Sequence, residues 1–150
     1  MQNPILKKGG KTMIRLVYVS SATKEMHQEE LLELLKQSRE KNKEKNLTGM
    51  LLYANGNFFQ VLEGEQSDVI ALYNKIIKDE RHRNCFEIDQ SEIEERTFGE
   101  WSMGFKYLTL EDKKSLEGFS EFLDKKMQPH EFAANPSEVV ELLYNFKQNI

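Results

Sequence analysis

The sequence predicts an α+β domain whose elements follow the order β-α-β-β-α-β, with a fifth strand and two further helices after them. Three observations favour this fold class. Two segments show the spacing of amphipathic helices, an Asn-Gly pair separates two apolar runs, and several short segments are rich in β-branched and aromatic residues. With 150 residues, of which 39% are hydrophobic, the chain can bury a core of its own without further crosslinks.

The charge and cysteine content exclude several functional classes. Lys and Arg number 21 and Asp and Glu number 25, so the net charge is −4. An acidic chain lacks the basic face that a non-specific nucleic-acid binder needs. A single cysteine excludes an internal disulfide and a cysteine-based metal cluster, and we expect no metal. No apolar run is long enough to span a membrane, and no secretory signal precedes the first strand, so we expect a cytoplasmic protein.

The first strand is predicted at residues 14–20, after a polar segment at 1–12 that we expect to be a flexible tail. The strand is apolar on both faces, as is typical of a central strand. Because side chains alternate along a strand, Tyr18 shares one face with Leu16 and Ser20.

The first helix is predicted at residues 28–43. One of its stripes recurs at spacings of four, three and four residues and consists of Leu31, Leu35, Ser38 and Asn42. The stripe begins apolar and ends polar. Its end therefore either approaches solvent or holds something polar.

A hairpin is predicted where strands at residues 48–54 and 57–64 flank Asn55-Gly56. Asn-Gly between apolar runs is typical of a two-residue type I′ turn. That turn places Gln60 opposite Leu51, with Phe58 and Leu62 beside it on the same face. Both faces of this hairpin are apolar, so we expect both to be covered.

The remaining elements are a second helix at residues 67–79, a charged loop at 79–83, strands at 85–93 and 101–108, and helices that begin near Thr109 and Asn135-Pro136. This order is that of a ferredoxin-like sheet. We expect the first two helices to cover one face of the sheet. The two C-terminal helices, within residues 109–150, would cover the other.

Two polar side chains in predicted strands attract attention, although each has an ordinary structural interpretation. Tyr18 and Gln60 can both be core residues whose polar atoms are satisfied nearby. In the predicted topology, however, their strands lie side by side, so the two meet on the helix-covered face. The first helix and the charged loop bring other polar side chains to the same patch: Ser38, Asn42, Arg81 and His82. A phenol, two amides, an apolar slot and a cationic rim suit a flat heteroaromatic ligand that carries phosphates.

Five segments together match a known family pattern: RLVYVS at 15–20, LTGMLLY at 47–53, GNFFQVLEG at 56–64, DERH at 79–82 and RTFGEWSM at 96–103. With these segments the chain resembles the BLUF family, blue-light sensors that use flavin. The resemblance implies a flavin-binding BLUF domain at residues 13–108. The two C-terminal helices resemble those of stand-alone members of the family.

The resemblance also implies residue roles in the photochemistry. Tyr18 would donate an electron and a proton to the excited flavin, and Gln60 would bridge Tyr18 and the flavin ring. Trp101 and Met103 would relay the signal by exchanging positions or hydrogen bonds. After the proton has moved, Gln60 would rotate or tautomerise, and a small red shift of the flavin absorption would follow.

For flavin binding, the resemblance implies that Asn42 binds the polar edge of the ring with support from Ser38. Arg81 and His82 would meet the ribityl phosphate. Lys41 departs from the family pattern, because many members have His or Asn there. We expect FAD, with FMN and riboflavin as open alternatives.

The expected function is a blue-light photoreceptor without enzymatic activity. It would signal to a downstream regulatory protein by direct contact and form a homo-oligomer. Two alternatives stay open: an RNA-binding ferredoxin-like module and a small flavin reductase. The acidic charge disfavours the first, and the lack of a Gly-rich phosphate loop or a Ser/His/Asp arrangement disfavours an enzyme.

Overall fold

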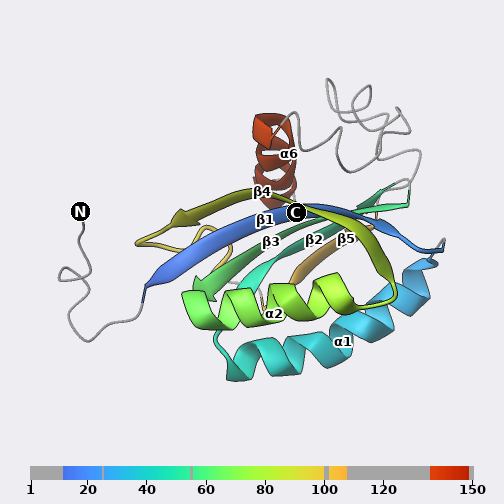
Figure 1. Ribbon diagram of the computed structural model, residues 1–150, viewed down its shortest axis with the longest axis horizontal. Helices are drawn as coiled ribbons and strands as arrows, with labels where there is room; N and C mark the ends of the chain where they lie inside the picture. Colours follow the sequence, from blue (N-terminus) through green and yellow to red (C-terminus); the bar gives the residue numbers. More distant parts are fainter. Residues whose placement is uncertain (1–11, 25, 55, 100–101, 108–135, 149–150) are drawn as a thin grey trace.

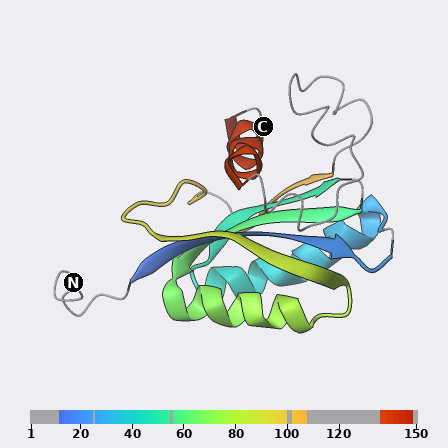
Figure 2. The same cartoon turned by 45° about the horizontal axis from the view of Figure 1, so that its top comes forward.

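The computed structural model describes residues 12–24, 26–54, 56–99, 102–107 and 136–148. The elements are β1 Met13–Ala22, α1 Gln28–Glu44, β2 Thr48–Ala54, β3 Asn57–Glu65, α2 Gln66–Lys78, β4 His82–Glu92, β5 Gly104–Tyr107 and α6 Pro136–Gln148. Within these residues, five strands form one mixed sheet in the order β4-β1-β3-β2-β5. Helices α1 and α2 lie on one side of this sheet and α6 on the other (Figures 1 and 2).

The predicted α+β fold class is therefore confirmed, including helices on both faces of the sheet. The predicted helix start at Pro136 agrees with α6. The helix predicted to begin near Thr109 lies outside the described residues.

Strands β1 and β3 form the centre of the sheet and pair antiparallel, with Tyr18 directly opposite Gln60. Nearly every residue of both strands is buried, because their two faces are apolar and each face is covered. The prediction of a central first strand beside the second hairpin strand is confirmed.

The hairpin register is also confirmed, since Leu51 faces Gln60 and Tyr53 faces Phe58. Gly56 has φ 77°, a conformation that a type I′ turn requires and that glycine adopts without a side-chain clash. Asn55, the other turn residue, lies outside the described part of the chain.

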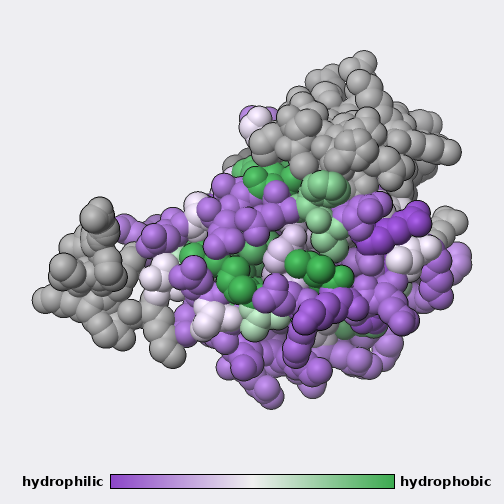
Figure 3. Space-filling view, viewed as in Figure 1, coloured by the Kyte–Doolittle hydropathy of each residue, from purple (hydrophilic) through white to green (hydrophobic). Residues whose placement is uncertain are grey.

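Each face of the sheet has its own hydrophobic core. On one face, side chains of β1, β2 and β3 pack against α1 and α2, which contribute Leu31, Leu35, Val69 and Tyr73. On the opposite face, other side chains of the same strands pack against Val139, Leu142 and Leu143 of α6. The helices are amphipathic, and the region that α1 and α2 occupy in Figure 1 is largely hydrophilic at its surface (Figure 3). No helix in the described residues is long and apolar enough to cross a membrane.

Two predicted strand starts are wrong by three residues, whereas the other described boundaries agree with the prediction to within two residues. Strand β4 begins at His82, so part of the predicted charged loop at 79–83 belongs to the strand. Strand β4 lies at the sheet edge and exposes most of its side chains, so polar residues are tolerated there and hydrophobic alternation does not mark its start.

The last strand begins at Gly104 rather than at residue 101 and pairs in parallel with β2. Met103 therefore precedes the strand. Trp101 is outside the described residues.

Candidate functional site

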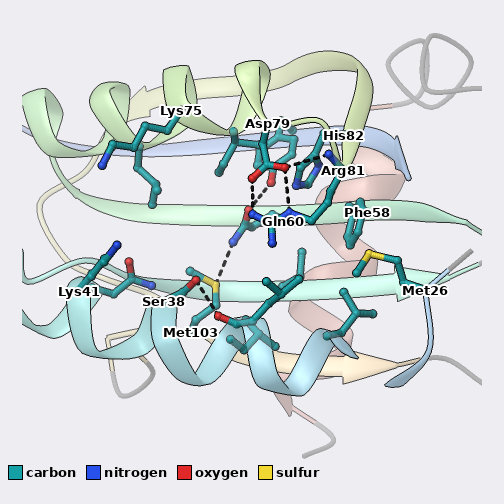
Figure 4. A pocket seen from close by; sticks show the side chains of 18 residues that line it. Met26, Ser38, Lys41, Phe58, Gln60, Lys75, Asp79, Arg81, His82 and Met103 are labelled. Carbon is teal, nitrogen blue, oxygen red and sulfur yellow. Dashed lines mark hydrogen bonds and ion pairs between the residues drawn. The ribbon is translucent and has the colours of Figure 1, made fainter. Parts of the chain in front are cut away.

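A pocket of about 370 Å³ lies between α1 and α2, over the central strands. Its volume falls within the ~300–1,000 Å³ that is usual for sites enclosing a small molecule. Apolar side chains from both helices form its walls, among them Leu31, Leu35, Leu72 and Ile76. Polar side chains from the sheet and from the two helices face one another across it (Figure 4).

Tyr18 and Gln60 meet on the floor of this pocket, as the sequence predicted. The Tyr18 hydroxyl donates a hydrogen bond to Gln60 Oε1, and Gln60 Nε2 donates to Met103 Sδ at 3.2 Å. Tyr18 has no exposed surface and Gln60 is 7% exposed. Burial raises the pKa of Tyr18 well above its ordinary value, with smaller contributions from nearby Cys85, Tyr73 and Asp79. The phenol is therefore a protonated donor at neutral pH.

Two buried amides keep unused hydrogen-bonding capacity toward the pocket. Gln60 Nε2 carries two hydrogens, and within the described part of the chain only the contact to Met103 uses one. Asn42 donates from Nδ2 to the Ser102 carbonyl at 2.9 Å, while its Oδ1 has no partner among the residues described. Leaving such groups unpaired costs about 1–3 kcal/mol each. The pocket thus offers one donor and one acceptor to a ligand with a complementary polar edge.

Ser38 lines the same pocket from an exposed position on α1. Its hydroxyl donates to the Leu34 carbonyl one turn earlier at 3.0 Å. The structure therefore places Ser38 and Asn42 on the same wall of the pocket. The Ser38 hydroxyl proton is already engaged in the hydrogen bond to Leu34.

Arg81 and His82 lie together at one end of the pocket (Figure 4). The Arg81 guanidinium is bound to Asp79, with Nε 2.8 Å from Oδ1 and Nη2 in contact with Oδ2. The hydrogen bonds from Arg81 lower the pKa of Asp79 to about 2. Arg81 and Asp79 thus form a closed ion pair.

His82 belongs to a different set of contacts. Its Nδ1 lies 2.8 Å from Ser20 Oγ, and its ring centroid lies 4.6 Å from that of Phe58. Burial lowers the pKa of His82 to about 4; Asp79 raises it and Arg81 lowers it by smaller amounts. The imidazole is therefore neutral at pH 7.

Met103 is 2% exposed and is held from two sides. Its sulfur accepts from Gln60, and its carbonyl accepts from Arg39 Nε at 2.9 Å. The position predicted to relay a signal thus contacts both the pocket floor and α1. The neighbouring candidate, Trp101, lies beyond what the structure describes.

Sequence reasoning did not single out Lys75, which lines the pocket from α2. The signal was present, because Leu72, Lys75 and Asp79 recur at i, i+3 and i+7 and therefore lie along one side of the helix. Lys41 was noted only as a departure from a family pattern. It lines the pocket from α1.

Sequence reasoning also missed a buried carboxylate that holds the segment before β5. Glu63 has no exposed surface and accepts backbone hydrogen bonds from Thr97 at 3.0 Å and Phe98 at 2.8 Å. Its carboxylate also pairs with Arg15 Nη2 at 2.9 Å. Phe98 then stacks on Tyr144 of α6 with 5.8 Å between ring centroids. The segment 96–103 therefore contacts the pocket through Met103 and the opposite face of the sheet through Phe98.

The sequence matches the model of the family described as "BLUF: Sensors of blue-light using FAD" over residues 13–104. It is 35% identical over 96 residues to the photoactivated adenylate cyclase subunit beta of Euglena longa. The aligned residues make up 63% of this chain and 11% of that protein. The chain thus spans about a tenth of the length of the curated relative.

Solved structures show the same likeness. The structure described as "BlrB - a BLUF protein, dark state structure" has a TM-score of 0.76 and 26% identity, covering 93% of this chain and 98% of that chain. A bacterial light-regulated adenylyl cyclase has a TM-score of 0.67 and 36% identity, covering 73% of this chain and 34% of that chain.

In the part of this chain that the structure describes, no group of three or more His, Cys, Asp or Glu is arranged to hold a metal ion.

Proposed function

The chain belongs to the BLUF family, sensors of blue light using FAD, and we propose that it senses blue light by rearranging the hydrogen bonds around Tyr18 and Gln60 and passes the signal to a protein partner. The observation that carries this proposal is the Tyr18–Gln60–Met103 chain of hydrogen bonds on the pocket floor. The family is one of sensors, so we propose sensing rather than catalysis as the role of this chain.

The pocket residues fit a flavin. The apolar walls formed by α1 and α2 suit the two faces of a flat ring. The free N–H of Gln60 and Oδ1 of Asn42 suit a ring edge that presents both a carbonyl and an N–H. We propose that these two residues bind that edge, that Ser38 supports Asn42, and that Arg81 and His82 border the ligand at one end. FAD is the proposed form, as in the family description, with FMN and riboflavin as the alternatives.

A bound flavin supplies blue-light absorption and, once excited, a strong oxidant. Tyr18 would donate an electron to this excited flavin. A phenol that has lost an electron becomes strongly acidic, and the Tyr18 hydroxyl already donates to Gln60 Oε1. The proton would therefore leave along this existing hydrogen bond, and Gln60 would pass it to the flavin that has accepted the electron.

Gln60 then rotates or tautomerises. Rotation of the amide would place Oε1 beside Met103 Sδ. Both atoms are acceptors, so the hydrogen bond from Gln60 to the Met103 sulfur would be lost, while that from Arg39 to the Met103 carbonyl would remain.

Release of the Met103 sulfur is the proposed start of the output. Met103 ends the segment that Glu63 holds at Thr97 and Phe98, and Phe98 packs on α6. One remade hydrogen bond is worth about 1 kcal/mol, enough to shift the populations of two nearly balanced arrangements. We propose that Trp101 takes part in this shift and that the C-terminal helices present it to a downstream regulatory protein.

The proposed organisation is a tail at residues 1–12, a flavin-binding domain at 13–108 and a C-terminal helical cap at 109–150, in a chain that forms a homo-oligomer. The relatives support a role in controlling effectors, because their names describe light-regulated cyclases. The identity of the effector for this chain is the least constrained part of the proposal.

Absorption spectroscopy tests the proposed photochemistry. The flavin-loaded chain should show a reversible red shift under blue light. Tyr18→Phe lacks the proton donor and Gln60→Leu lacks the bridging amide, so each should still bind flavin and lose the shift. Gln90→Leu is a matched control, because Gln90 is exposed on the edge strand β4, and it should keep the shift.

A normal photocycle in Gln60→Leu would contradict the assigned role of the amide. A wild-type chain that binds none of FAD, FMN and riboflavin would remove the proposed function altogether.

A further inference from the structure

Two lysines reach the pocket from opposite walls. Lys41 of α1 and Lys75 of α2 both line it, and in Figure 4 their side chains lie at the same end, away from Arg81 and His82. Both residues are exposed. The side-chain ammonium group of neither lysine forms a hydrogen bond or an ion pair with any residue that the structure describes. They are therefore cations with their charge available to a ligand.

The other end of the pocket offers no comparable charge. The Arg81 guanidinium donates two hydrogen bonds to the Asp79 carboxylate, so the opposite charges of this ion pair cancel. His82 is neutral at pH 7 and its Nδ1 contacts Ser20. Breaking the Arg81 contacts to reach a ligand would leave the Asp79 carboxylate unpaired. The positive potential of the pocket is consequently concentrated at the end formed by Lys41 and Lys75.

Gln60, one of the two proposed ring-binding residues, lies between these two ends (Figure 4). Gln60 sits in the middle of the view in Figure 4, with the lysines on one side and Arg81 and His82 on the other. The volume of about 370 Å³ is at the lower end of the usual range for enclosed ligands. A ring seated at Gln60 and Asn42 fills much of it, so any phosphate carried on a chain attached to the ring reaches an end of the pocket. Of the two ends, only the one with the lysines attracts it.

We propose that Lys41 and Lys75 recognise the phosphate of the bound flavin, so that this chain prefers the phosphorylated forms, FMN and FAD, over riboflavin. This inference rests on the proposed function. A phosphate monoester carries about −1.5 to −2 charges at pH 7, and the diphosphate bridge of FAD is similarly charged, whereas riboflavin is uncharged. The preference therefore separates riboflavin from both phosphorylated forms. The sequence expectation that Arg81 and His82 meet the phosphate stays a prediction, and the same measurements compare it with the lysine pair.

Titration calorimetry of the flavin-free chain with riboflavin, FMN and FAD tests the inference. An exposed ion pair is worth about 0.2–1 kcal/mol, or roughly 3-fold in affinity. The wild-type chain should thus bind FMN and FAD about 10-fold more tightly than riboflavin at low salt, and high salt should reduce this ratio. Lys41→Ala and Lys75→Ala should each reduce the ratio about 3-fold, and the double variant should bring it close to one.

Riboflavin affinity is the internal control, because the lysines should not affect it. Lys36→Ala and Lys78→Ala serve as matched variants, since both residues are exposed on the same helices and neither lines the pocket. Both should keep the wild-type ratio.

Three results would overturn the inference. They are equal wild-type affinities for riboflavin and FMN, a preference that survives in the double variant, and an equal loss of riboflavin and FMN binding in the lysine variants. If the preference survives in the double variant and falls in Arg81→Gln, the phosphate is bound at the other end. A chain that binds riboflavin and responds to light without any preference refutes the lysine assignment and leaves the proposed function standing. A chain that binds no flavin at all refutes both.

Discussion

Only one of the two orientations of the Gln60 amide satisfies both of its neighbours. The Tyr18 hydroxyl can donate or accept, whereas the Met103 sulfur can only accept. With Oε1 toward Tyr18 and Nε2 toward Met103, both contacts are hydrogen bonds. The reverse orientation loses the second one, at a cost of about 1 kcal/mol. The residue-level preference for one orientation is thus small enough to be reversed by a change at Tyr18.

The lowered pKa of His82 predicts that the stability of the fold depends on pH. This pKa is lowered to about 4 in the folded chain from an ordinary value of 6.5. As the pH falls below 6.5, the unfolded chain takes up this proton before the folded chain does. The free energy of unfolding should therefore fall between pH 6.5 and 4 by up to ~3 kcal/mol, at ~1.4 kcal/mol per pH unit.

Urea denaturation at pH 7 and pH 5 measures this slope. His82→Gln keeps a polar side chain beside Ser20 and removes the titration, so its stability should change less between the two pH values. Since Asp79 has a pKa of about 2, its own contribution is retained at pH 5. An unchanged slope in His82→Gln would show that other groups cause the dependence.

At the scale of elements, the hairpin depends on a close approach of β2 and β3. A Cβ added to Gly49 would lie 2.0 Å from the Val61 carbonyl oxygen, and Gly49 has φ 156°. A backbone oxygen cannot move aside as a flexible side chain can. The close pairing of the two strands thus requires glycine at this position.

Substituting alanine for Gly49 and, separately, for Gly56 distinguishes the effect of the close strand approach at Gly49 from the effect of the turn conformation at Gly56. Gly49→Ala should lower the free energy of unfolding by more than ~3 kcal/mol, because the clash involves the backbone of the partner strand. Gly56→Ala meets no atom within 4 Å but holds φ 77°, so it should cost only about 1–2 kcal/mol. Denaturant midpoints compare the two variants, and a smaller loss in Gly49→Ala would refute the steric argument.

The segment 96–103 shows why irregular segments escape sequence prediction. Its described residues, 96–99 and 102–103, lie in no helix or strand, and the position of Thr97 and Phe98 depends on Glu63, more than thirty residues earlier in the chain. A buried carboxylate that accepts two backbone hydrogen bonds and pairs with Arg15 leaves no periodic pattern in the sequence. Its partners become visible only when the strands are assembled.

At the scale of the whole molecule, one sheet separates a ligand pocket from a second core. Helices α1 and α2 border the pocket, and α6 covers the opposite face (Figure 2). A ferredoxin-like RNA-binding module uses an open sheet face to stack bases. Here, within the described residues, both faces are covered, which disfavours that alternative.

The packing of α6 predicts that the two sides of the sheet unfold together. Leu142 has no exposed surface and packs in the core beneath α6, so Leu142→Ala should lower the free energy of unfolding by about 2–5 kcal/mol. Glu141→Ala, at an exposed position on the same helix, should change it by less than ~0.5 kcal/mol.

Chemical denaturation followed by circular dichroism and by tyrosine fluorescence measures both variants. The two signals should change in a single transition. If Leu142→Ala leaves the global stability unchanged, α6 detaches independently of the sheet.

The sequence by itself determined the order of the described elements, the hairpin register and the faces on which Tyr18 and Gln60 lie. Strand alternation, helical spacing and the Asn55-Gly56 turn are local properties, so neighbouring residues suffice to predict them. Only the tertiary structure decided where the edge strand β4 begins. The same holds for the contact of Gln60 with Met103 and for the hydrogen bonds of Glu63 to the segment before β5. These features join residues far apart in the chain, and their geometry follows from how the sheet and helices pack.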